Sequence, residues 1–308
     1  MLSVVGCAPD TGTFMDPKGP VAAAQKAHLL ELFWLTSIAV VPVILLVPIL
    51  LWRYRYRTDA SAYRPQWEYN RWLDVVMWGV PIAIIVILSF NLWQNVRDLD
   101  PYRPLDGEHA PVRIQVIGLD WKWLFVYPDH GIASMGQMAI PVDTPIRLDL
   151  TSDTVMQSFI VAELGGQIYT MPGMRTQLNF LASESGTFTG ENMQYNGEGF
   201  ATQKFAVEAM TPMDFDRWVS TARQSPKKLN EETYALLAKR ATKAETAVAF
   251  GAPAGQITLI FGSVQPELFQ TVIQRYLSGD AVPASRQPGA PKQVASSSMK
   301  RDASGSVP

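Results

Sequence analysis

The side chains that most often perform chemistry in proteins are scarce in this sequence. Its 308 residues include a single cysteine, Cys7, and three histidines, His28, His109 and His130. One cysteine cannot build a disulfide framework or a cysteine-based metal site within the chain. We interpret the three histidines as surface or linker residues rather than as metal ligands. The sequence therefore predicts no metal site in this chain.

Cys7 is nevertheless a candidate for covalent modification. It ends the run Val4-Val5-Gly6-Cys7, which resembles a bacterial lipobox, the motif whose cysteine becomes the lipidated first residue of a mature lipoprotein. The alternative is an isolated cysteine, because the six preceding residues are too few for the basic and apolar regions of a signal peptide. The topology predicted below places Cys7 on the outer face, just ahead of a membrane helix. We therefore favour lipidation and expect the start of the sequence to be truncated.

Asp74 is the acidic residue with the most suggestive position. It lies where the second of two long apolar runs begins. A carboxylate near a membrane edge can collect protons from water and pass them inward. The alternative is that Asp74 caps a helix and interacts with the positive end of its dipole. Both interpretations stay open.

The two apolar runs predict a transmembrane hairpin within residues 32–94. They extend from Leu32 to Trp52 and from Val75 to Trp93, and neither contains a charged residue. A helix rises ~1.5 Å per residue, so about 20 residues span the ~30 Å core of a bilayer. Pro42 and Pro48 are tolerated in such a helix because neighbouring helices can satisfy the freed carbonyls.

The connector, residues 53–72, sets the predicted orientation. It carries five arginines, whereas the outer flank of each apolar run carries two basic residues. The positive-inside rule makes the connector cytoplasmic. Residues 1–31 and everything after residue 94 are then on the outer face. The net charge of −2 argues against a nucleic-acid partner, because phosphate binding needs a basic surface.

The remainder of the chain changes from strands to helices. Apolar residues alternate with polar ones at four places between residues 112 and 210, as at Ile146, Leu148 and Leu150, which predicts a compact antiparallel sandwich or Greek-key barrel. A C-terminal extension over residues 211–280 is predicted to be helical. Its helices are expected from Thr211-Pro212-Met213-Asp214 onward, over Glu231–Lys243 and over Pro266–Leu277. Residues 281–308 are too polar to bury a core and predict a disordered periplasmic tail.

Several segments resemble subunit II of the haem-copper oxidases. The run from Gly118 to Pro128, GLDWKWLFVYP, is similar to the aromatic segment that opens the cupredoxin domain of that family, in particular in quinol oxidases of the cytochrome bo type. Core packing is the alternative role for Trp121 and Trp123 in this run. Residues 16–19, 78–81, 165–174 and 266–269 resemble the same subunit, and their order over residues 7–280 makes coincidence an unsatisfactory explanation.

The resemblance implies a fold. It consists of two N-terminal transmembrane helices followed by an all-β cupredoxin-like Greek-key sandwich with C-terminal helices. The domain over residues 112–210 would be the sandwich, on the periplasmic side. The resemblance also places Trp121 at the position where electrons enter the cytochrome c oxidases.

The expected copper ligands are missing. In the cytochrome c oxidases this domain holds a dinuclear copper site, built from an upstream histidine and a C-x₃-C-x₃-H-x₂-M loop, whose soft thiolate and imidazole ligands suit copper. The resemblance places these positions at Gln157, Tyr195, Gly199, Gln203 and Ala206. None of these side chains can replace the two thiolates. Without the copper relay, the resemblance implies the branch that oxidises quinol, whose electrons enter subunit I directly.

The resemblance thus implies subunit II of a proton-pumping respiratory quinol oxidase in the inner membrane of a bacterium. Ubiquinol would be oxidised and O₂ reduced to water in subunit I, which holds the haems and copper. The chain itself would have no cofactor. It would contact subunit I, further small membrane subunits and lipid, and would meet quinol only through subunit I. Asp74 matches the position where the family has a carboxylate, usually glutamate, at the entrance of a proton pathway.

Two other classes of protein remain as alternatives. One is an electron-transfer copper protein, against which the missing ligands count heavily. The other is a membrane-anchored periplasmic binding lipoprotein that is not part of an oxidase. The second alternative leaves the family-like segments unexplained.

Overall fold

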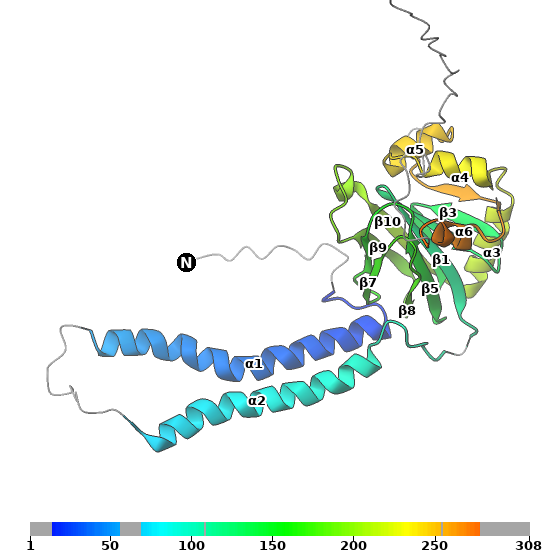
Figure 1. The fold of residues 1–308 in the computed structure, drawn as a ribbon. Helices are drawn as coiled ribbons and strands as arrows, with labels where there is room; N and C mark the ends of the chain where they lie inside the picture. The colour runs from blue at the N-terminus through cyan, green and yellow to red at the C-terminus, as the bar shows by residue number, and fades with distance from the viewer. Residues whose placement is uncertain (1–13, 56–68, 108, 254, 278–308) are drawn as a thin grey trace, which may run out of the picture.

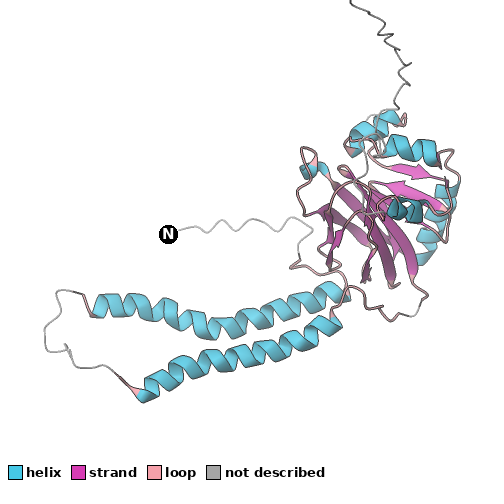
Figure 2. Ribbon diagram, in the orientation of Figure 1, coloured by secondary structure: helices cyan, strands magenta, loops and turns pink. Residues whose placement is uncertain are grey.

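The computed structural model describes residues 14–55, 69–107, 109–253 and 255–277. Two long helices form an antiparallel pair beside a β-sandwich, and short helices of the C-terminal extension lie against the sandwich (Figures 1 and 2). The long helices are α1 (Pro20–Arg53) and α2 (Arg71–Asp98). Cys7, residues 56–68 of the connector and the 281–308 tail lie outside the described residues.

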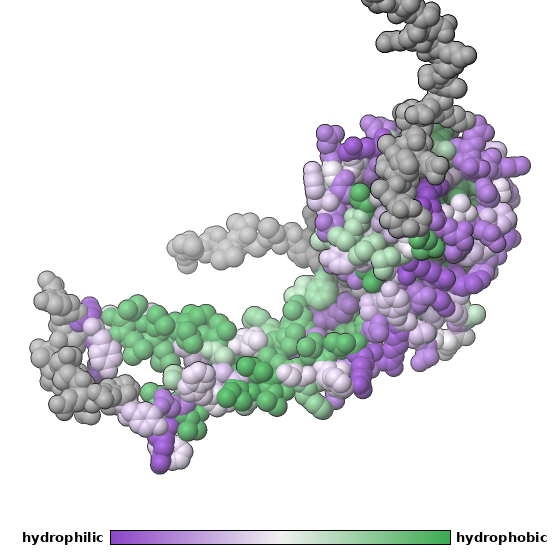
Figure 3. All heavy atoms as spheres, in the orientation of Figure 1, coloured by the Kyte–Doolittle hydropathy of each residue, from purple (hydrophilic) through white to green (hydrophobic). Residues whose placement is uncertain are grey.

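Both long helices have the length and apolar surface of membrane spans. The most apolar 18-residue window of each has none of its residues buried inside the chain, and apolar side chains cover much of the helix pair (Figure 3). The helices are longer than the apolar runs that predicted them. The 34 residues of α1 correspond to about 51 Å, more than the ~30 Å core of a bilayer. The surplus lets the helices continue beyond the apolar core to the β-domain.

The β-domain consists of two packed sheets. The six-stranded sheet has the order β12-β3-β2-β1-β5-β8 and the five-stranded sheet the order β4-β10-β9-β6-β7. The strands of the first are β1 (Val112–Leu119), β2 (Lys122–Tyr127), β3 (Ile132–Met135), β5 (Ile146–Ser152), β8 (Thr176–Phe180) and β12 (Leu259–Phe261). Those of the second are β4 (Gln137–Pro141), β6 (Gln157–Val161), β7 (Gln167–Thr170), β9 (Gly186–Asn192) and β10 (Lys204–Met210).

The strand directions correct one detail of the sequence prediction. The cupredoxin-like sandwich is confirmed, but it is not purely antiparallel. β1 pairs in parallel with β5, from Val112↔Ile146 to Gly118↔Ser152, and β10 pairs in parallel with β4. The physical reason is the path of the chain. After β3 it crosses to the second sheet as β4 and re-enters the first sheet as β5, so β1 and β5 are not joined by a hairpin and can run in the same direction.

Two hydrophobic cores lie on opposite faces of the six-stranded sheet. The inner core, between the sheets, contains Trp123, whose ring lies 5.3 Å from that of Phe159 in an edge-to-face arrangement. The outer core contains Leu124 and Val126 and is covered by the C-terminal extension. β2 is therefore buried at every position. Its two-sided burial explains why residues 122–127 show no polar and apolar alternation.

The C-terminal extension departs in part from the predicted helices. The predicted start of α3 (Pro212–Arg223) is confirmed, because the Thr211 side chain accepts a hydrogen bond from the Asp214 N–H at 3.2 Å. The single helix predicted over residues 231–243 is wrong. Two helices, α4 (Glu231–Leu237) and α5 (Lys243–Ala249), replace it, because Thr242 and Glu245 form a capping box that starts a new helix. The remaining elements are β11 (Lys228–Leu229), β13 (Ser263–Val264) and α6 (Leu268–Gln274).

Candidate functional site

The five positions predicted to correspond to copper ligands do not converge on one point. Gln157 begins β6 and Gln203 directly precedes β10, and their side chains meet, with Gln203 Nε2 donating to Gln157 Oε1 at 2.6 Å. Tyr195 is 71% exposed in the loop between β9 and β10. Gly199 lies in the same loop, against an aromatic ring. Ala206 is a half-buried residue of β10.

Both polar atoms of the Gln157 side-chain amide form hydrogen bonds. Its Nε2 donates to the Leu119 carbonyl at 3.1 Å and to Thr154 Oγ1 at 3.2 Å. Gly118 leaves room for this side chain, because a Cβ there would lie 2.8 Å from Gln157 Oε1. Gln157 is fully buried. Its hydrogen bonds therefore avoid the cost of burying an unpaired amide.

Two asparagines complete the same network. Gln203 Oε1 accepts from Asn192 Nδ2 at 3.0 Å and from Asn196 Nδ2 at 2.7 Å. Asn192 Oδ1 accepts in turn from the Ser158 N–H at 2.9 Å. We refer to Gln157, Asn192, Asn196 and Gln203 as the amide cluster. The sequence prediction missed Asn192 and Asn196, although the concentration of amide residues between 192 and 203 was a visible signal.

The amide cluster does not fit a dinuclear copper centre. Such a centre needs thiolate and imidazole ligands. The cluster offers neutral amides, which are hydrogen-bonded to one another and to backbone groups. Within the described ranges, no group of three or more His, Cys, Asp or Glu residues could hold a metal ion. The amide cluster therefore supplies no ligands for a copper electron-transfer site.

The two tryptophans of the aromatic segment have different surroundings. Trp123 is a core residue, as the packing alternative predicted. Trp121 has a left-handed φ of 61° and lies against Gly199, where a Cβ would come within 2.2 Å of the indole ring. Its Nε1–H donates to the Asn196 carbonyl at 3.2 Å, and the Arg240 guanidinium lies 4.9 Å from the ring centroid. The extension thus covers Trp121, which is only 7% exposed.

Lys122 joins the sandwich to the extension. Its side chain is almost fully buried, and its ammonium donates to the carbonyls of Asp120, Lys239 and Ala241 at 3.0, 2.8 and 2.9 Å. Burial disfavours the charged form and lowers the pKa of Lys122 to about 8. The last two acceptors belong to the turn between α4 and α5. Lys122 therefore holds that turn against β2.

Asp153 makes a second polar connection to the extension. The Arg275 guanidinium donates to both carboxylate oxygens at 2.6 Å, and Tyr234 Oη donates to Oδ2 at 2.6 Å. The Tyr276 hydroxyl donates to the Asp153 carbonyl at 2.7 Å. Burial raises the pKa of the Asp153 carboxyl above its ordinary value, against the opposing effect of Arg275. Asp153 precedes β6, so the extension also holds the turn that leads to Gln157.

The remaining candidates lie elsewhere. Asp74 is in the first turn of α2, but the N-cap is Asn70, whose side chain accepts from the N–H groups of Trp72 and Leu73. His28 is in α1, His109 is exposed before β1, and His130 is in the turn between β2 and β3, where burial lowers its pKa. The structure does not bring these groups together.

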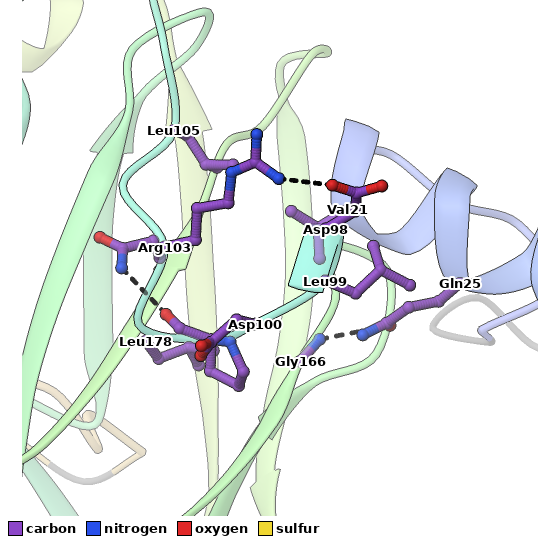
Figure 4. Close-up of a pocket in the computed structure, with 11 residues that line it drawn as sticks. Val21, Gln25, Asp98, Leu99, Asp100, Arg103, Leu105, Gly166 and Leu178 are labelled. Atoms are coloured by element: carbon purple, nitrogen blue, oxygen red, sulfur yellow. Dashed lines mark hydrogen bonds and ion pairs between the residues drawn. The ribbon is translucent and has the colours of Figure 1, made fainter. Parts of the chain in front are cut away.

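A small cavity marks the junction of the helix pair and the β-domain (Figure 4). Its volume is about 20 Å³, and Gln25, Asp98, Arg103 and Asn179 are among its lining residues. Arg103 donates to Asp98 at 2.7 Å, and Asn179 Nδ2 donates to the Pro101 carbonyl at 2.9 Å. This space suits a single water molecule and is too small for an organic substrate.

The β-domain matches a known family model. The model described as cytochrome c oxidase subunit II, periplasmic domain, matches residues 132–210. The fold and this match define the class of the β-domain, a periplasmic domain of the cytochrome c oxidase subunit II type. The periplasmic domain of subunit II of cytochrome oxidase from Bradyrhizobium japonicum is a structural neighbour, with 24% identity, a TM-score of 0.37 and coverage of 40% of this chain and 98% of that domain. That similarity is low and adds nothing to the sequence relationship.

Two relatives extend the match over most of the chain. Cytochrome bo(3) ubiquinol oxidase subunit 2 of Pseudomonas putida is 39% identical over 276 residues, which cover 90% of this chain and 83% of the relative. Ubiquinol oxidase subunit 2 of Acetobacter aceti is 39% identical over 280 residues, covering 90% and 86%. The chain belongs to the ubiquinol oxidase subunit 2 family, which confirms the resemblance found in the sequence.

Proposed function

We propose that this chain is a non-redox subunit II of a proton-pumping ubiquinol oxidase. In this proposal, subunit I holds the haems and copper, oxidises ubiquinol and reduces O₂ to water, and the present chain has no cofactor. The observation that carries the proposal is the amide cluster, in which Gln157 and Gln203 occupy expected copper-ligand positions and bind each other. The names of the relatives support ubiquinol as the electron donor.

The first role of the chain is to anchor the β-domain. The described parts of α1 and α2 expose apolar side chains along their length, such as Ile44, which is 63% exposed. In the membrane these surfaces would meet lipid or the helices of subunit I and further small subunits. We place both helices across the inner membrane of a bacterium, with the β-domain in the periplasm. Acylation of Cys7 would add a second anchor there.

The second role is contact with the outer surface of subunit I. Exposed apolar residues lie on neighbouring segments at one end of the sandwich, among them Met156, Tyr169, Met193 and Tyr195. β6 connects them, because Ser158 pairs with Tyr169 and its carbonyl accepts from the Met193 N–H at 3.0 Å. The 3₁₀ helix η2 (Phe200–Thr202) is in the same loop as Tyr195. The yellow-green segment around it lies at the edge of the β-domain, on the side toward which the two long helices extend (Figure 1). Such a surface suits a partner embedded beside the helix pair.

The third role is proton uptake through Asp74. Asn70 already caps α2, so capping does not require Asp74. The carboxylate is half-buried near the cytoplasmic end of the helix in the proposed orientation. It could accept protons from water and deliver them into subunit I.

The deciding experiment is purification of the tagged chain from its native membrane in mild detergent. We expect haem absorbance in the purified material and oxygen consumption that depends on ubiquinol and not on reduced cytochrome c. A haem-free chain without oxidase activity would overturn the proposal. Oxygen consumption that depends on cytochrome c would overturn the non-redox role, because electrons would then have to pass through the β-domain.

A further inference from the structure

The amide cluster connects the two sheets of the sandwich. Gln157 and Asn192 belong to β6 and β9 of the five-stranded sheet, whereas the Leu119 carbonyl ends β1 of the six-stranded sheet. Gln203 Nε2 also reaches that carbonyl, at 3.4 Å. The Leu119 carbonyl of the six-stranded sheet thus accepts hydrogen bonds from the side chains of both Gln157 and Gln203.

The cluster also closes the loop between β9 and β10. The loop runs from Met193 to Gln203, and the Asn192 N–H donates to the Gln203 carbonyl at its base at 3.3 Å. Asn192 and Gln203 are buried below the loop, and Asn196 reaches down to Gln203 from the loop itself. The loop carries two exposed apolar side chains, Met193, which directly follows the base, and Tyr195. The fixed base therefore supports these exposed side chains.

Two glycines leave room for side chains in this part of the sandwich. Gly118 admits the Gln157 side chain, and Gly199 admits the Trp121 ring. The Asn196 carbonyl then accepts from Trp121, and Trp121 lies under Arg240 of the extension. The cluster is in this way linked to both sheets and to the covering helices. Buried polar networks favour one conformation over its competitors when their members are satisfied. Both amide atoms of Gln157, Asn192 and Gln203 are hydrogen-bonded, whereas Asn196 bonds through Nδ2 and its buried Oδ1 has no partner among the described residues.

We propose that the amide cluster is a brace that fixes this end of the sandwich by side-chain hydrogen bonds. Two of its members, Gln157 and Gln203, occupy positions expected to correspond to copper ligands in the related domains. Gln203 is its central residue, because it donates to Gln157 and accepts from Asn192 and Asn196. The brace sets the position of the 193–203 loop and, through the Asn196 carbonyl, of Trp121. It is a property of the chain itself and does not depend on the proposed oxidase activity.

The proposal is tested by hydrogen exchange on the full-length chain purified in mild detergent, with mass-spectrometric readout. Gln203→Leu keeps the size of the side chain and removes its hydrogen bonds. We expect amide exchange in residues 193–203 to accelerate about tenfold or more, because opening of this loop no longer has to break the hydrogen bonds of Gln203. Exchange in α3, away from the cluster, should keep its wild-type rate.

Gln194→Leu is the matched control. Gln194 lies in the same loop, and only its backbone groups bind Asn192. The same substitution there should leave exchange unchanged. Asn196→Ala is a milder second variant for the case in which Gln203→Leu fails to fold, since it removes one of the bonds to Gln203 Oε1 from a half-buried position. Exchange at the wild-type rate in both Gln203→Leu and Asn196→Ala, or equal acceleration in Gln194→Leu, would overturn the proposal.

Discussion

The Lys18 N–H donates a hydrogen bond of 2.7 Å to the Glu163 carbonyl, which joins the segment just before α1 to the loop between β6 and β7. The Lys18 carbonyl accepts in turn from the Ser183 N–H at 2.8 Å. Lys18 thus connects two loops of the β-domain by its backbone alone. The sequence segments 16–19 and 165–174 resembled the same family separately. The structure places Gly165 of the second segment against the chain just after the first, because a Cβ on Gly165 would be 2.8 Å from the Ala22 nitrogen.

Gly19 is the first residue whose substitution should break this junction. A Cβ on Gly19 would lie 2.2 Å from the Leu181 carbonyl oxygen, which is backbone and cannot move aside alone. Gly19→Ala should destabilise the junction by about 1–3 kcal/mol. Thermal unfolding of the purified chain should then begin about 5 °C lower.

Gly186→Ala is the control for this substitution. A Cβ on Gly186 makes only ordinary contact, 3.6 Å from the Phe188 ring. Its unfolding temperature should stay near that of the wild type. Equal unfolding temperatures for Gly19→Ala and the wild type would contradict the close approach at Leu181.

A strand that faces a core on one side only has an alternating pattern that the sequence displays. β10 shows this well, because Phe205, Val207 and Ala209 are buried and alternate with less buried residues. β2 has no such pattern, since both of its faces are covered. Its outer neighbours come from the extension, more than a hundred residues later in the chain. A local window cannot detect burial that depends on so distant a segment.

The sequence pointed to two members of the amide cluster but not to the cluster itself. The resemblance to oxidase subunit II singled out Gln157 and Gln203, together with residues 195, 199 and 206, as positions without thiolates or imidazoles. It did not reveal what replaces the ligands. Asn192 reaches Gln203 because β9 pairs with β10 in the register Glu191↔Lys204, and it reaches Ser158 because β9 pairs with β6 in the register Asn192↔Phe159. Strand register is set by the whole sheet and is not written in the loop.

Asp74→Asn separates a proton-transfer role from a dipole role. The substitution removes the titratable proton and keeps the shape of the side chain. We expect ubiquinol-dependent oxygen uptake or proton pumping to fall by about tenfold or more, because a positioned acid is lost. Loss of a dipole interaction alone would cost about 0.5 kcal/mol and leave activity unchanged. The measurement is oxygen uptake and proton release in proteoliposomes.

Asp74→Glu serves as the matched variant, since it moves the carboxylate by one methylene and keeps its charge. It should retain most of the activity. Haem content should equal that of the wild type in both variants, which shows that the complex has assembled. Full pumping by Asp74→Asn would leave the helix dipole as the only role of this residue.

Met193→Asp tests contact between subunit I and the end of the sandwich that carries the 193–203 loop. Met193 is 54% exposed in the isolated chain. In the proposed complex it is covered, and an unpaired carboxylate in an apolar contact costs several kcal/mol. The ratio of haem to chain after purification should therefore fall.

Met213→Asp provides the same change on a different surface. Met213 is 71% exposed at the start of α3, where an acidic residue is favourable. Its haem ratio should match the wild type. Equal haem ratios in the two aspartate variants would show that the loop end does not contact the haem-bearing partner.

Lys122→Met tests the connection between β2 and the extension through its pH dependence. The pKa of Lys122 is lowered from 10.5 to about 8. Between these pH values the unfolded state binds more protons than the folded state, so the contribution of this residue to stability increases as the pH rises. The full effect corresponds to about 3 kcal/mol. Lys122→Met lacks this titration and leaves the carbonyls of Asp120, Lys239 and Ala241 without the lysine donor, so it should be less stable at pH 7.

The stability difference between wild type and Lys122→Met should therefore widen from pH 7 to pH 10, measured by thermal unfolding in detergent. Groups that titrate in both proteins cancel in this difference. Lys239→Met is the control, because Lys239 is exposed and only its carbonyl contacts Lys122. Its difference from the wild type should stay constant with pH. A gap for Lys122→Met that stays constant would mean that the buried amine keeps its ordinary pKa, stabilised by its three acceptors as fully as by water. A gap that narrows would mean that its pKa is raised, and either result would contradict the prediction.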